Sequence, residues 1–164
     1  MNFNEIDIIV SEIDGIITNG LKPLDHMNHT MFKYYYERDF EAIKELKRFF
    51  TFVFLADDPD VSYNIMRTRN IPAFFVQGND SKLKILNEKI MSRYNMRPEN
   101  LLYIGNKISD IPCMHHAEIG FTIPQSAMKV QQAATTVLDV PSGFGVISKV
   151  HDILHTEIEK RKRK

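Results

Sequence analysis

Short apolar runs alternate along the chain with longer stretches in which apolar residues recur every three or four positions. The short runs predict β-strands over residues 6–11, 51–56, 73–77, 101–105, 119–123 and 135–140. The longer stretches predict helices over residues 39–50, 60–69, 81–95, 109–117, 125–133 and 145–159. Because helical crossovers join parallel strands, this alternation indicates an α/β fold with a parallel sheet of about six strands between helices.

Residues 21–36, LKPLDHMNHTMFKYYY, interrupt this alternation. The turn-forming DHMNH lies between two short extended stretches, which predicts a β-hairpin that projects from the sheet after its first strand. The second arm, MFKYYY, is rich in aromatic residues that favour strands. Two interpretations of this arm stay open, namely burial against another subunit and packing of the tyrosines on their own domain.

The chain length and charge narrow the class of protein. The 164 residues suffice for one domain with a core, which we place at residues 1–159, and are too few for two. The 21 basic and 21 acidic residues balance, so no overall field favours nucleic acid or an anionic membrane. No apolar run approaches the roughly 18 residues that span a bilayer. The basic tail KRKRK, residues 160–164, is expected to be a frayed, solvated end.

Cysteine content and the first residues bear on the compartment. Cys113 is the single cysteine, which excludes an intramolecular disulfide and fits a reducing compartment. The opening MNFNEID lacks the basic and apolar regions of a signal peptide. We therefore expect a cytoplasmic protein.

Polar side chains follow the predicted strands at the points where the strands end. In an open parallel sheet these ends meet at one edge, where the binding crevice lies. Carboxylates and a lysine around one crevice suit a hard divalent cation and a phosphate group, although solvated loop charges are the alternative. These strand-end residues are Glu12, Asp14, Ala56, Asp57, Asp58, Gly78, Asn79, Lys82, Gly105, Asn106, Lys107 and Asp110.

Three of these segments, EIDGIITNG, QGNDSKL and YIGNKISD, resemble the motifs of the haloacid dehalogenase superfamily in order and spacing. The specific resemblance is to its small capless branch, which contains the phosphatases of KDO 8-phosphate and of related nine-carbon sugar acid phosphates. The chain is also similar to the carboxyl-terminal domain of animal CMP-sialic acid synthetases. The resemblance covers residues 6–155 and implies a Rossmann-like core with a protruding hairpin and no cap domain.

The resemblance implies a role for individual residues. In such phosphatases one aspartate attacks phosphorus, the aspartate two residues later acts as acid and base, and a lysine holds the phosphate beside magnesium. Carried over, the catalytic positions are Glu12 as nucleophile, Asp14 as acid/base and Lys82 as phosphate lysine. The substrate-binding positions are Ala56, Asp57, Arg38, Gly78 and Asn79. The magnesium positions are Glu12, Asp14, Asn106 and Asp110.

The chain departs from the family pattern at four catalytic positions. Glu12 replaces the nucleophilic Asp, Ala56 a phosphate-binding hydroxyl, Asn106 a metal-binding Asp, and Lys107 a second Asp. The extra methylene of Glu12 moves its carboxylate by about an ångström, and misplacement on that scale costs about a hundredfold in rate. Fewer carboxylates predict weak or lost magnesium binding. We hypothesise that the Lys107 ammonium takes the cation position and pairs with Glu12 and Asp14.

Two classes of function remain open from the sequence. The first is a weakly active or inactive phosphatase-like protein with an assembly or regulatory role in sugar acid metabolism, resembling the synthetase domain and working with a cytidylyltransferase partner. The second is an active magnesium-dependent phosphomonoesterase that attacks a sugar acid phosphate with Glu12. In the resembled phosphatases the hairpin packs into a tetramer, so we expect a homotetramer through residues 21–36.

Overall fold

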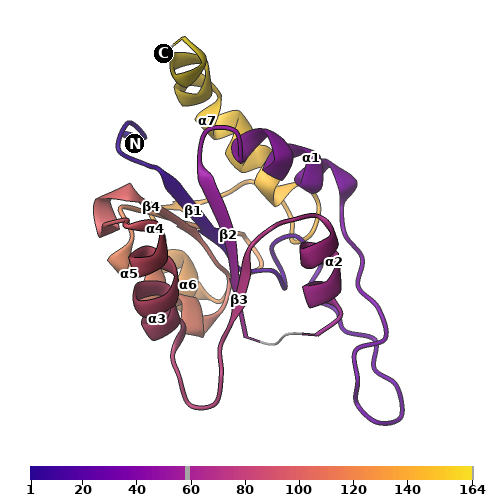
Figure 1. Cartoon of the computed structure of the whole chain (residues 1–164). Helices are drawn as coiled ribbons and strands as arrows, with labels where there is room; N and C mark the ends of the chain where they lie inside the picture. The colour runs from indigo at the N-terminus through magenta and orange to yellow at the C-terminus, as the bar shows by residue number, and fades with distance from the viewer. Residues whose placement is uncertain (58–59, 164) are drawn as a thin grey trace.

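The computed structural model describes residues 1–57 and 60–163. Within this part of the chain, six parallel strands form one sheet in the order β3-β2-β1-β4-β5-β6 (Figure 1). The strands are β1 (Ile8–Ser11), β2 (Thr51–Ala56), β3 (Ala73–Phe75), β4 (Leu101–Ile104), β5 (Ile119–Thr122) and β6 (Thr136–Val137). The predicted α/β fold is confirmed, and β1 lies at the centre of the sheet between β2 and β4.

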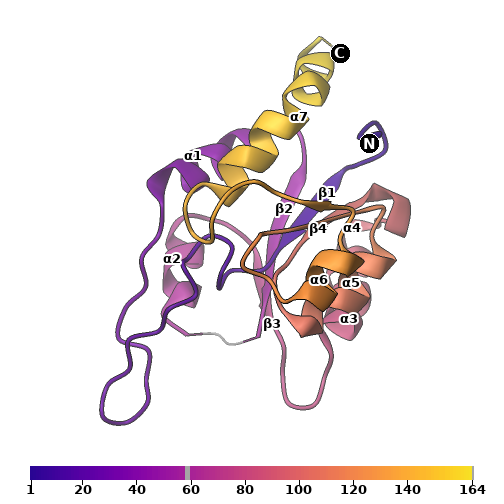
Figure 2. The same ribbon diagram turned by 180° about the vertical axis from the view of Figure 1, so that it is seen from behind.

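Helices cover both faces of this sheet (Figures 1 and 2). One face carries α1 (Glu37–Leu46), α2 (Ser62–Thr68) and α7 (Val146–Lys162). The other carries α3 (Lys82–Ile85), the π-helical turn η1 (Leu86–Met91), α4 (Ser92–Tyr94), α5 (Ile111–His116) and α6 (Met128–Ala133). Two short 3₁₀ turns, η2 (Pro98–Asn100) and η3 (Ile108–Asp110), flank β4. The predicted helix over 81–95 is thus α3, η1 and α4 in one continuous run.

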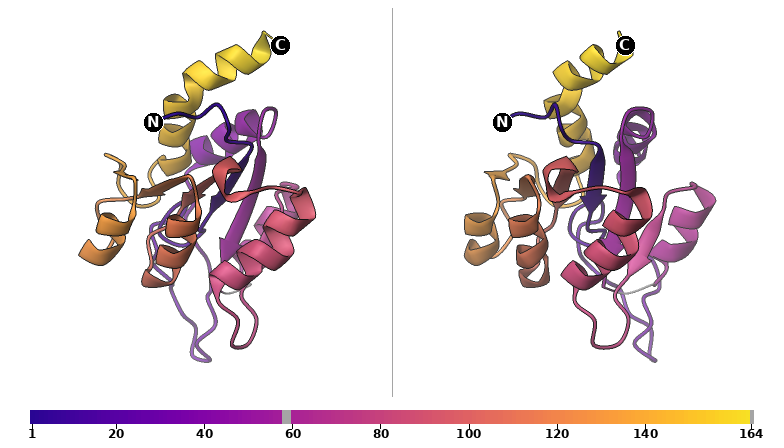
Figure 3. Two further views of the ribbon diagram at one scale, coloured as in Figure 1. Left: turned by 90° about the vertical axis from the view of Figure 1, so that its left-hand side faces the viewer. Right: turned by 60° about the vertical axis from the view of Figure 1, so that its left-hand side comes forward.

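The apolar runs form the strands because both of their faces are buried. Successive side chains of a strand point to opposite faces. Ile9 accordingly packs in the cluster that includes α1 and α7, while Ile8 and Val10 pack in the cluster that includes α3 and α5. Figure 3 shows the two helical layers on either side of the strands. A strand buried on both faces must be apolar throughout, which explains the unbroken IDIIV and TFVFLA runs.

The segment 21–36 projects from the domain as a long loop that returns on itself (Figure 1). It is held by antiparallel bridges between Thr18 and Tyr35 and between Leu24 and Thr30, rather than by continuous strands. The carboxylate of Asp25 closes the tip by accepting hydrogen bonds from the backbone N–H groups of residues 27 and 29, at 2.8 and 2.9 Å. This explains the turn-forming DHMNH sequence.

The carboxyl-terminal end differs from the prediction. Helix α7 continues to Lys162, so the expected frayed tail is wrong for residues 160–162, and residue 164 lies outside the described residues. The guanidinium of Arg161 donates to the carbonyl oxygens of Ile6 (2.6 Å) and Phe49 (3.0 Å). These contacts anchor the last turn to the domain. Among the described residues no helix has the length and apolar character needed to cross a membrane.

Candidate active site

The loops after β1, β2 and β4 meet at the carboxyl edge of the sheet. Strand β1 is hydrogen-bonded to β2 on one side and to β4 on the other, so the residues that follow these strands are brought together. The chain order reverses direction between β1 and β4, which is where open α/β sheets bind ligands. We call this place the crevice, and its wall is built by Glu12 and Asp14 after β1, Asp57 after β2, and Asn106 to Asp110 after β4.

The ammonium of Lys82 lies at the bottom of the crevice. Lys82 begins α3, and its side chain, like those of Glu12 and Asp110, is fully buried. Its Nζ contacts Glu12 Oε2 directly and lies 2.7 Å from Asp110 Oδ1 and 3.5 Å from Asp57 Oδ1. One cation is therefore shared by two buried carboxylates. We call Lys82, Glu12 and Asp110 the inner cluster.

Burial and the charges within the inner cluster shift the pKa values of Glu12 and Lys82. Burial raises the pKa of Glu12, and the attraction of Lys82 only partly offsets this because Asp110 repels the second negative charge. Burial lowers the pKa of Lys82, but Glu12 and Asp110 outweigh it and hold the pKa above its usual value. Lys82 is therefore a permanent cation, while Glu12 is less readily ionised than a free glutamate.

Asp110 is held rigidly by four donors. Its Oδ1 accepts from Lys82 and from the Tyr103 hydroxyl at 2.8 Å. Its Oδ2 accepts from the backbone N–H groups of Asn106 and Lys107, both at 2.9 Å. These bonds fix the backbone after β4 and place it beside Glu12. Asp110 thus orients both Lys82 and the loop that carries Lys107.

Lys107 lies over the inner cluster. Its Nζ is 2.6 Å from Asp57 Oδ2 and 3.6 Å from Glu12 Oε2. Burial lowers the pKa of Lys107, but Glu12 and Asp57 outweigh this and leave the pKa raised. The predicted pairing of Lys107 with Glu12 agrees with this geometry. The predicted pairing with Asp14 is wrong, because within the described contacts Asp14 pairs with two other lysines.

Asp14 forms a second charged cluster with residues of the projecting segment. Its Oδ1 lies 2.6 Å from Lys33 Nζ, and its Oδ2 lies 2.9 Å from Lys22 Nζ. Lys33, whose side chain is 1% exposed, also lies 2.5 Å from Asp60 Oδ2 and donates to Ser62 Oγ at 3.0 Å. We call Lys33, Asp14 and Asp60 the outer cluster.

The sequence interpretation missed Lys22, Lys33 and Asp60 as site residues. A signal for Lys33 existed in the MFKYYY arm, because alternate residues of an extended arm share a face. Lys33 and Tyr35 both point inward and both reach Ser62 Oγ, whereas Phe32 and Tyr34 are exposed. Asp60 belongs to the acidic run ADDPD, for which the sequence favours a helix cap over a cation site, and its Oδ1 accepts from the backbone N–H of Ser62 at 3.0 Å at the start of α2.

The outer cluster holds Asp14 as a carboxylate. Burial raises its pKa, but the hydrogen bonds and charges of Lys33 and Lys22 outweigh this and leave the pKa below the usual 3.8. A general acid must carry a proton at the working pH. In this arrangement Asp14 is suited to accept a proton and poorly suited to donate one.

The remaining predicted site residues are spread more widely. Ala56 ends β2 beside the crevice and is buried. Arg38 is exposed on α1 and lines a groove with Ser148 of α7 whose lining includes none of the crevice residues. Gly78 and Asn79 are exposed in the loop before α3, and the described crevice contacts do not include them. Among the described residues, the structure thus brings Glu12, Asp14, Asp57, Lys82, Asn106 and Asp110 to the crevice, and no described contact joins Arg38, Gly78 or Asn79 to them. Asp58, also predicted there, lies outside the described residues.

Asp39, which follows Arg38, is buried and has a local structural role. Its Oδ1 accepts from the backbone N–H of Ser148 at 2.9 Å and from the Ser148 hydroxyl at 3.2 Å. Ser148 lies in the first turn of α7, where backbone N–H groups lack partners within the helix. Asp39 therefore ties α1 to the start of α7.

The magnesium ligands implied by the resemblance do not fit a magnesium ion as they are arranged. Each carboxylate oxygen of Glu12, Asp14 and Asp110 already accepts from a protein donor. Only the buried Asn106 Oδ1 has no partner among the four ligands. Within the described residues, no group of three or more His, Cys, Asp or Glu side chains is placed to hold a metal.

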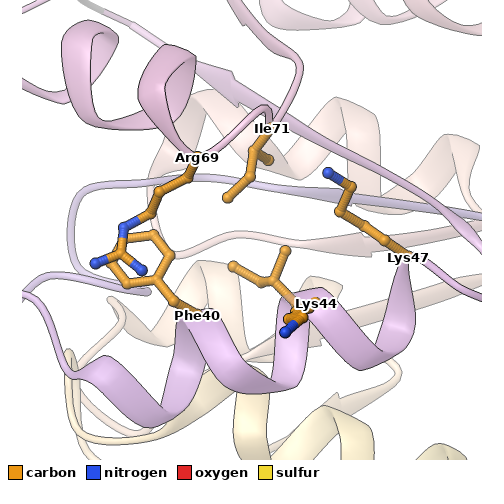
Figure 4. A pocket seen from close by; sticks show the side chains of 6 residues that line it. Phe40, Lys44, Lys47, Arg69 and Ile71 are labelled. Carbon is orange, nitrogen blue, oxygen red and sulfur yellow. The ribbon is translucent and has the colours of Figure 1, made fainter.

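A separate cavity of about 230 Å³ lies between α1 and the segment after α2 (Figure 4). The Arg69 guanidinium stacks 3.8 Å from the centroid of the Phe40 ring and donates to both Glu37 carboxylate oxygens at 2.9 Å. Lys47 Nζ donates to the Asn70 carbonyl oxygen. These basic groups join α1 to the end of α2, and the residues lining this cavity include none of the predicted site.

Comparison with known proteins agrees with this fold. The profile of haloacid dehalogenase-like hydrolases matches residues 8–150. A 3-deoxy-D-manno-octulosonate 8-phosphate phosphatase of Haemophilus influenzae is 23% identical over 159 residues, which cover 91% of this chain and 82% of the relative. A structure from Streptomyces avermitilis, described as a HAD family hydrolase, is 26% identical with a TM-score of 0.85 and 96% coverage of both chains.

Two solved phosphatases share the fold at lower identity. The cobalt-bound deoxy-D-mannose-octulosonate 8-phosphate phosphatase of Haemophilus influenzae is 20% identical, with a TM-score of 0.85 and coverage of 97% of this chain and 89% of that one. The Moraxella catarrhalis phosphatase in complex with magnesium, phosphate and KDO is 17% identical, with a TM-score of 0.83 and coverage of 93% and 87%. With the family profile spanning most of the chain, this protein belongs to the haloacid dehalogenase-like hydrolase family and is related to KDO 8-phosphate phosphatases.

Proposed function

We propose that this protein is a phosphatase-like member of the family whose hydrolysis of sugar acid phosphates is weak or lost, and whose role is assembly or regulation in sugar acid metabolism. One observation carries the proposal: both carboxylates that such hydrolysis needs are already bound to lysines. Glu12 contacts Lys82, and Asp14 lies between Lys33 and Lys22. A nucleophile and an acid that are neutralised internally are poorly placed to react with a phosphate ester.

The projecting segment supports the assembly part of the proposal. Its apolar side chains are exposed on the outer face, with Tyr34 67% exposed and Leu24, Met27 and Met31 each more than half exposed. An apolar patch of this kind is typical of a protein–protein contact. We propose a homotetramer formed through residues 21–36, in the cytoplasm, with a cytidylyltransferase of sialic acid or KDO metabolism as the partner enzyme.

The deciding experiment measures phosphate release from KDO 8-phosphate and from p-nitrophenyl phosphate in magnesium buffer. The unmodified protein is compared with Glu12→Asp, Asn106→Asp and the double variant. We expect no release above background from the unmodified protein and measurable release once both Asp residues are restored in a variant that also carries Lys107→Asp, which vacates the cation position. Release by the unmodified protein that disappears in Asp14→Asn overturns the proposal.

An active phosphomonoesterase is the second candidate, because one arrangement favours it. Glu12, Asp14 and Lys82 do lie at one crevice, as a nucleophile, an acid/base and a phosphate-binding lysine require. In this candidate a Glu12 oxygen attacks phosphorus to form an acyl phosphate while the bond from phosphorus to the sugar oxygen breaks, the leaving oxygen takes a proton from Asp14 or from water, and water then hydrolyses the acyl phosphate. Magnesium held by Glu12, Asp14, Asn106 and Asp110 would supply charge neutralisation. Substrate entry must then displace Lys33 from Asp14, so the Lys33→Met variant should hydrolyse faster than the unmodified protein.

A further inference from the structure

We propose that the crevice carries its own cation, the ammonium group of Lys107, at the position where the family resemblance places a divalent metal, and that this protein assembles the site without metal. The inference concerns the same crevice as the proposed function. It stands independently of whether the protein hydrolyses phosphate esters.

Every carboxylate oxygen of Glu12, Asp14 and Asp110 already has a donor partner within the protein. Glu12 Oε1 accepts from the backbone N–H of Ile13 at 3.0 Å, and Oε2 contacts Lys82. Both oxygens of Asp14 are bound to lysines, and both oxygens of Asp110 are bound to the donors described above. A magnesium ion needs near-octahedral oxygen ligands and dehydrates reluctantly, so it would have to displace several charge-assisted hydrogen bonds.

Lys107 is held in a position where its ammonium group lies between two carboxylates. Its backbone N–H is fixed by Asp110 Oδ2, and its side chain then crosses from the β4 loop to the ends of β1 and β2. There its Nζ lies between Asp57 Oδ2 and Glu12 Oε2, at 2.6 and 3.6 Å. Lys82 approaches the same two carboxylates from below. Lys107 thus bridges the carboxylates at the ends of β1 and β2, as a divalent cation would, while Lys82 keeps the position of the phosphate lysine.

The carboxylates and ammonium groups around the crevice nearly cancel in charge. The inner and outer clusters with their neighbours contain the carboxylates of residues 12, 14, 57, 60 and 110 and the ammonium groups of residues 22, 33, 82 and 107. Their formal net charge is minus one, so little negative charge is left to attract a divalent cation. The neutral Asn106 Oδ1 is the one uncommitted ligand, and a single amide oxygen does not hold magnesium.

The test is a titration of Mn²⁺ into the unmodified protein. The electron paramagnetic resonance signal of free Mn²⁺ measures how much of the ion stays unbound. The expected result is no binding at the crevice up to millimolar Mn²⁺. The Asn106→Asp/Lys107→Asp double variant removes one ammonium group and adds two carboxylates, and we expect its Mn²⁺ affinity to rise by about tenfold or more. Lys129→Asp, on the exposed face of α6, makes the same Lys-to-Asp exchange away from the crevice and should behave like the unmodified protein.

Submillimolar Mn²⁺ binding by the unmodified protein that competes with Mg²⁺ overturns the inference, and this measurement needs no variant to fold. A Lys107→Met variant gives a second readout. Removal of the internal cation should lower the thermal midpoint in EDTA, and Mg²⁺ should restore part of the loss in the variant and not in the unmodified protein. Phosphate release in EDTA would overturn the proposed function and leave this inference intact, whereas inactive protein that binds Mn²⁺ would do the reverse.

Discussion

The inner and outer clusters both place a buried lysine between two carboxylates, but different parts of the chain hold the two lysines. In the inner cluster, Lys82 is fixed by α3 and its partners by β1 and η3, all of which belong to the packed domain. In the outer cluster, Lys33 comes from the projecting segment, which is held mainly by isolated bridges. Both lysines are buried between two carboxylates. The difference is that the inner cluster is part of the core, while the outer cluster exists only when the segment is docked.

This difference means that breaking the two clusters should have different consequences. Breaking the inner cluster leaves charges inside the domain with no route to water, which is costly. Breaking the outer cluster frees a surface segment and lets Asp14 reach solvent. The outer cluster is therefore the direct link between the projecting segment and the carboxylate of Asp14.

The largest expected effect is that of Lys82→Met. The change leaves Glu12 and Asp110 buried without their shared cation, and we expect the free energy of unfolding to fall by about 3–5 kcal/mol. Urea unfolding followed by circular dichroism measures it. Lys84→Met is the control, because Lys84 is an exposed lysine of the same helix that pairs with Asp80. Its free energy of unfolding should equal that of the unmodified protein. Equal effects of the two variants would contradict the buried inner cluster.

Lys33→Met should have a smaller effect, about 1–3 kcal/mol, because Asp14 and Asp60 can regain water when the segment lifts. Hydrogen exchange should locate the change: amides of residues 21–36 exchange faster, while those of β1 and β4 keep their protection. Faster exchange throughout the sheet would mean that the outer cluster supports the core as much as the inner cluster does.

The pH dependence should differ between the clusters. Lys33 is a cause of the lowered pKa of both Asp14 and Asp60, whose usual value is 3.8. Their contribution to stability is therefore present above pH 3.8 and is lost as the pH falls through the lower folded value. Glu12 has the opposite sign, because its raised pKa favours the folded state below 4.5 and this contribution is lost as the pH rises. Lys33→Met should accordingly lose less stability than the unmodified protein between about pH 6 and pH 3 in urea titrations.

The smallest expected effect on stability is that of a Phe32→Ser/Tyr34→Ser double variant. These side chains stack edge to face on the outer side of the arm, with ring centroids 5.4 Å apart, and are exposed. We expect unfolding of the isolated chain to change by no more than about 0.5 kcal/mol. Analytical ultracentrifugation should nevertheless show loss of the tetramer. A tetramer that survives the double change would assign the assembly surface elsewhere.

The sheet and its helices followed from the sequence because burial on both faces forces a readable pattern. β2 was predicted with its bounds as they are, and β1 and β4 within two residues, since each is apolar throughout. The edge strand β6 shrank to two residues, because an edge strand is buried less and its pattern is weaker. The frayed tail was mispredicted because Arg161 is retained by backbone carbonyls at the other end of the chain, which no local pattern reveals.

The sequence by itself determined the fold, the gathering of Glu12, Asp14, Lys82 and Asp110 at one edge, and the resemblance to phosphatases. The fold and this gathering follow from the apolar periods and from the rule that parallel strands end together, whereas the resemblance rests on the motifs EIDGIITNG, QGNDSKL and YIGNKISD. Only the tertiary structure decided which lysine meets which carboxylate. Lys33 meets Asp14 from 19 residues away and Lys82 meets Glu12 from 70 residues away. Such pairs depend on how a long side chain threads between packed elements, and charge alone leaves that choice open because every lysine attracts every carboxylate.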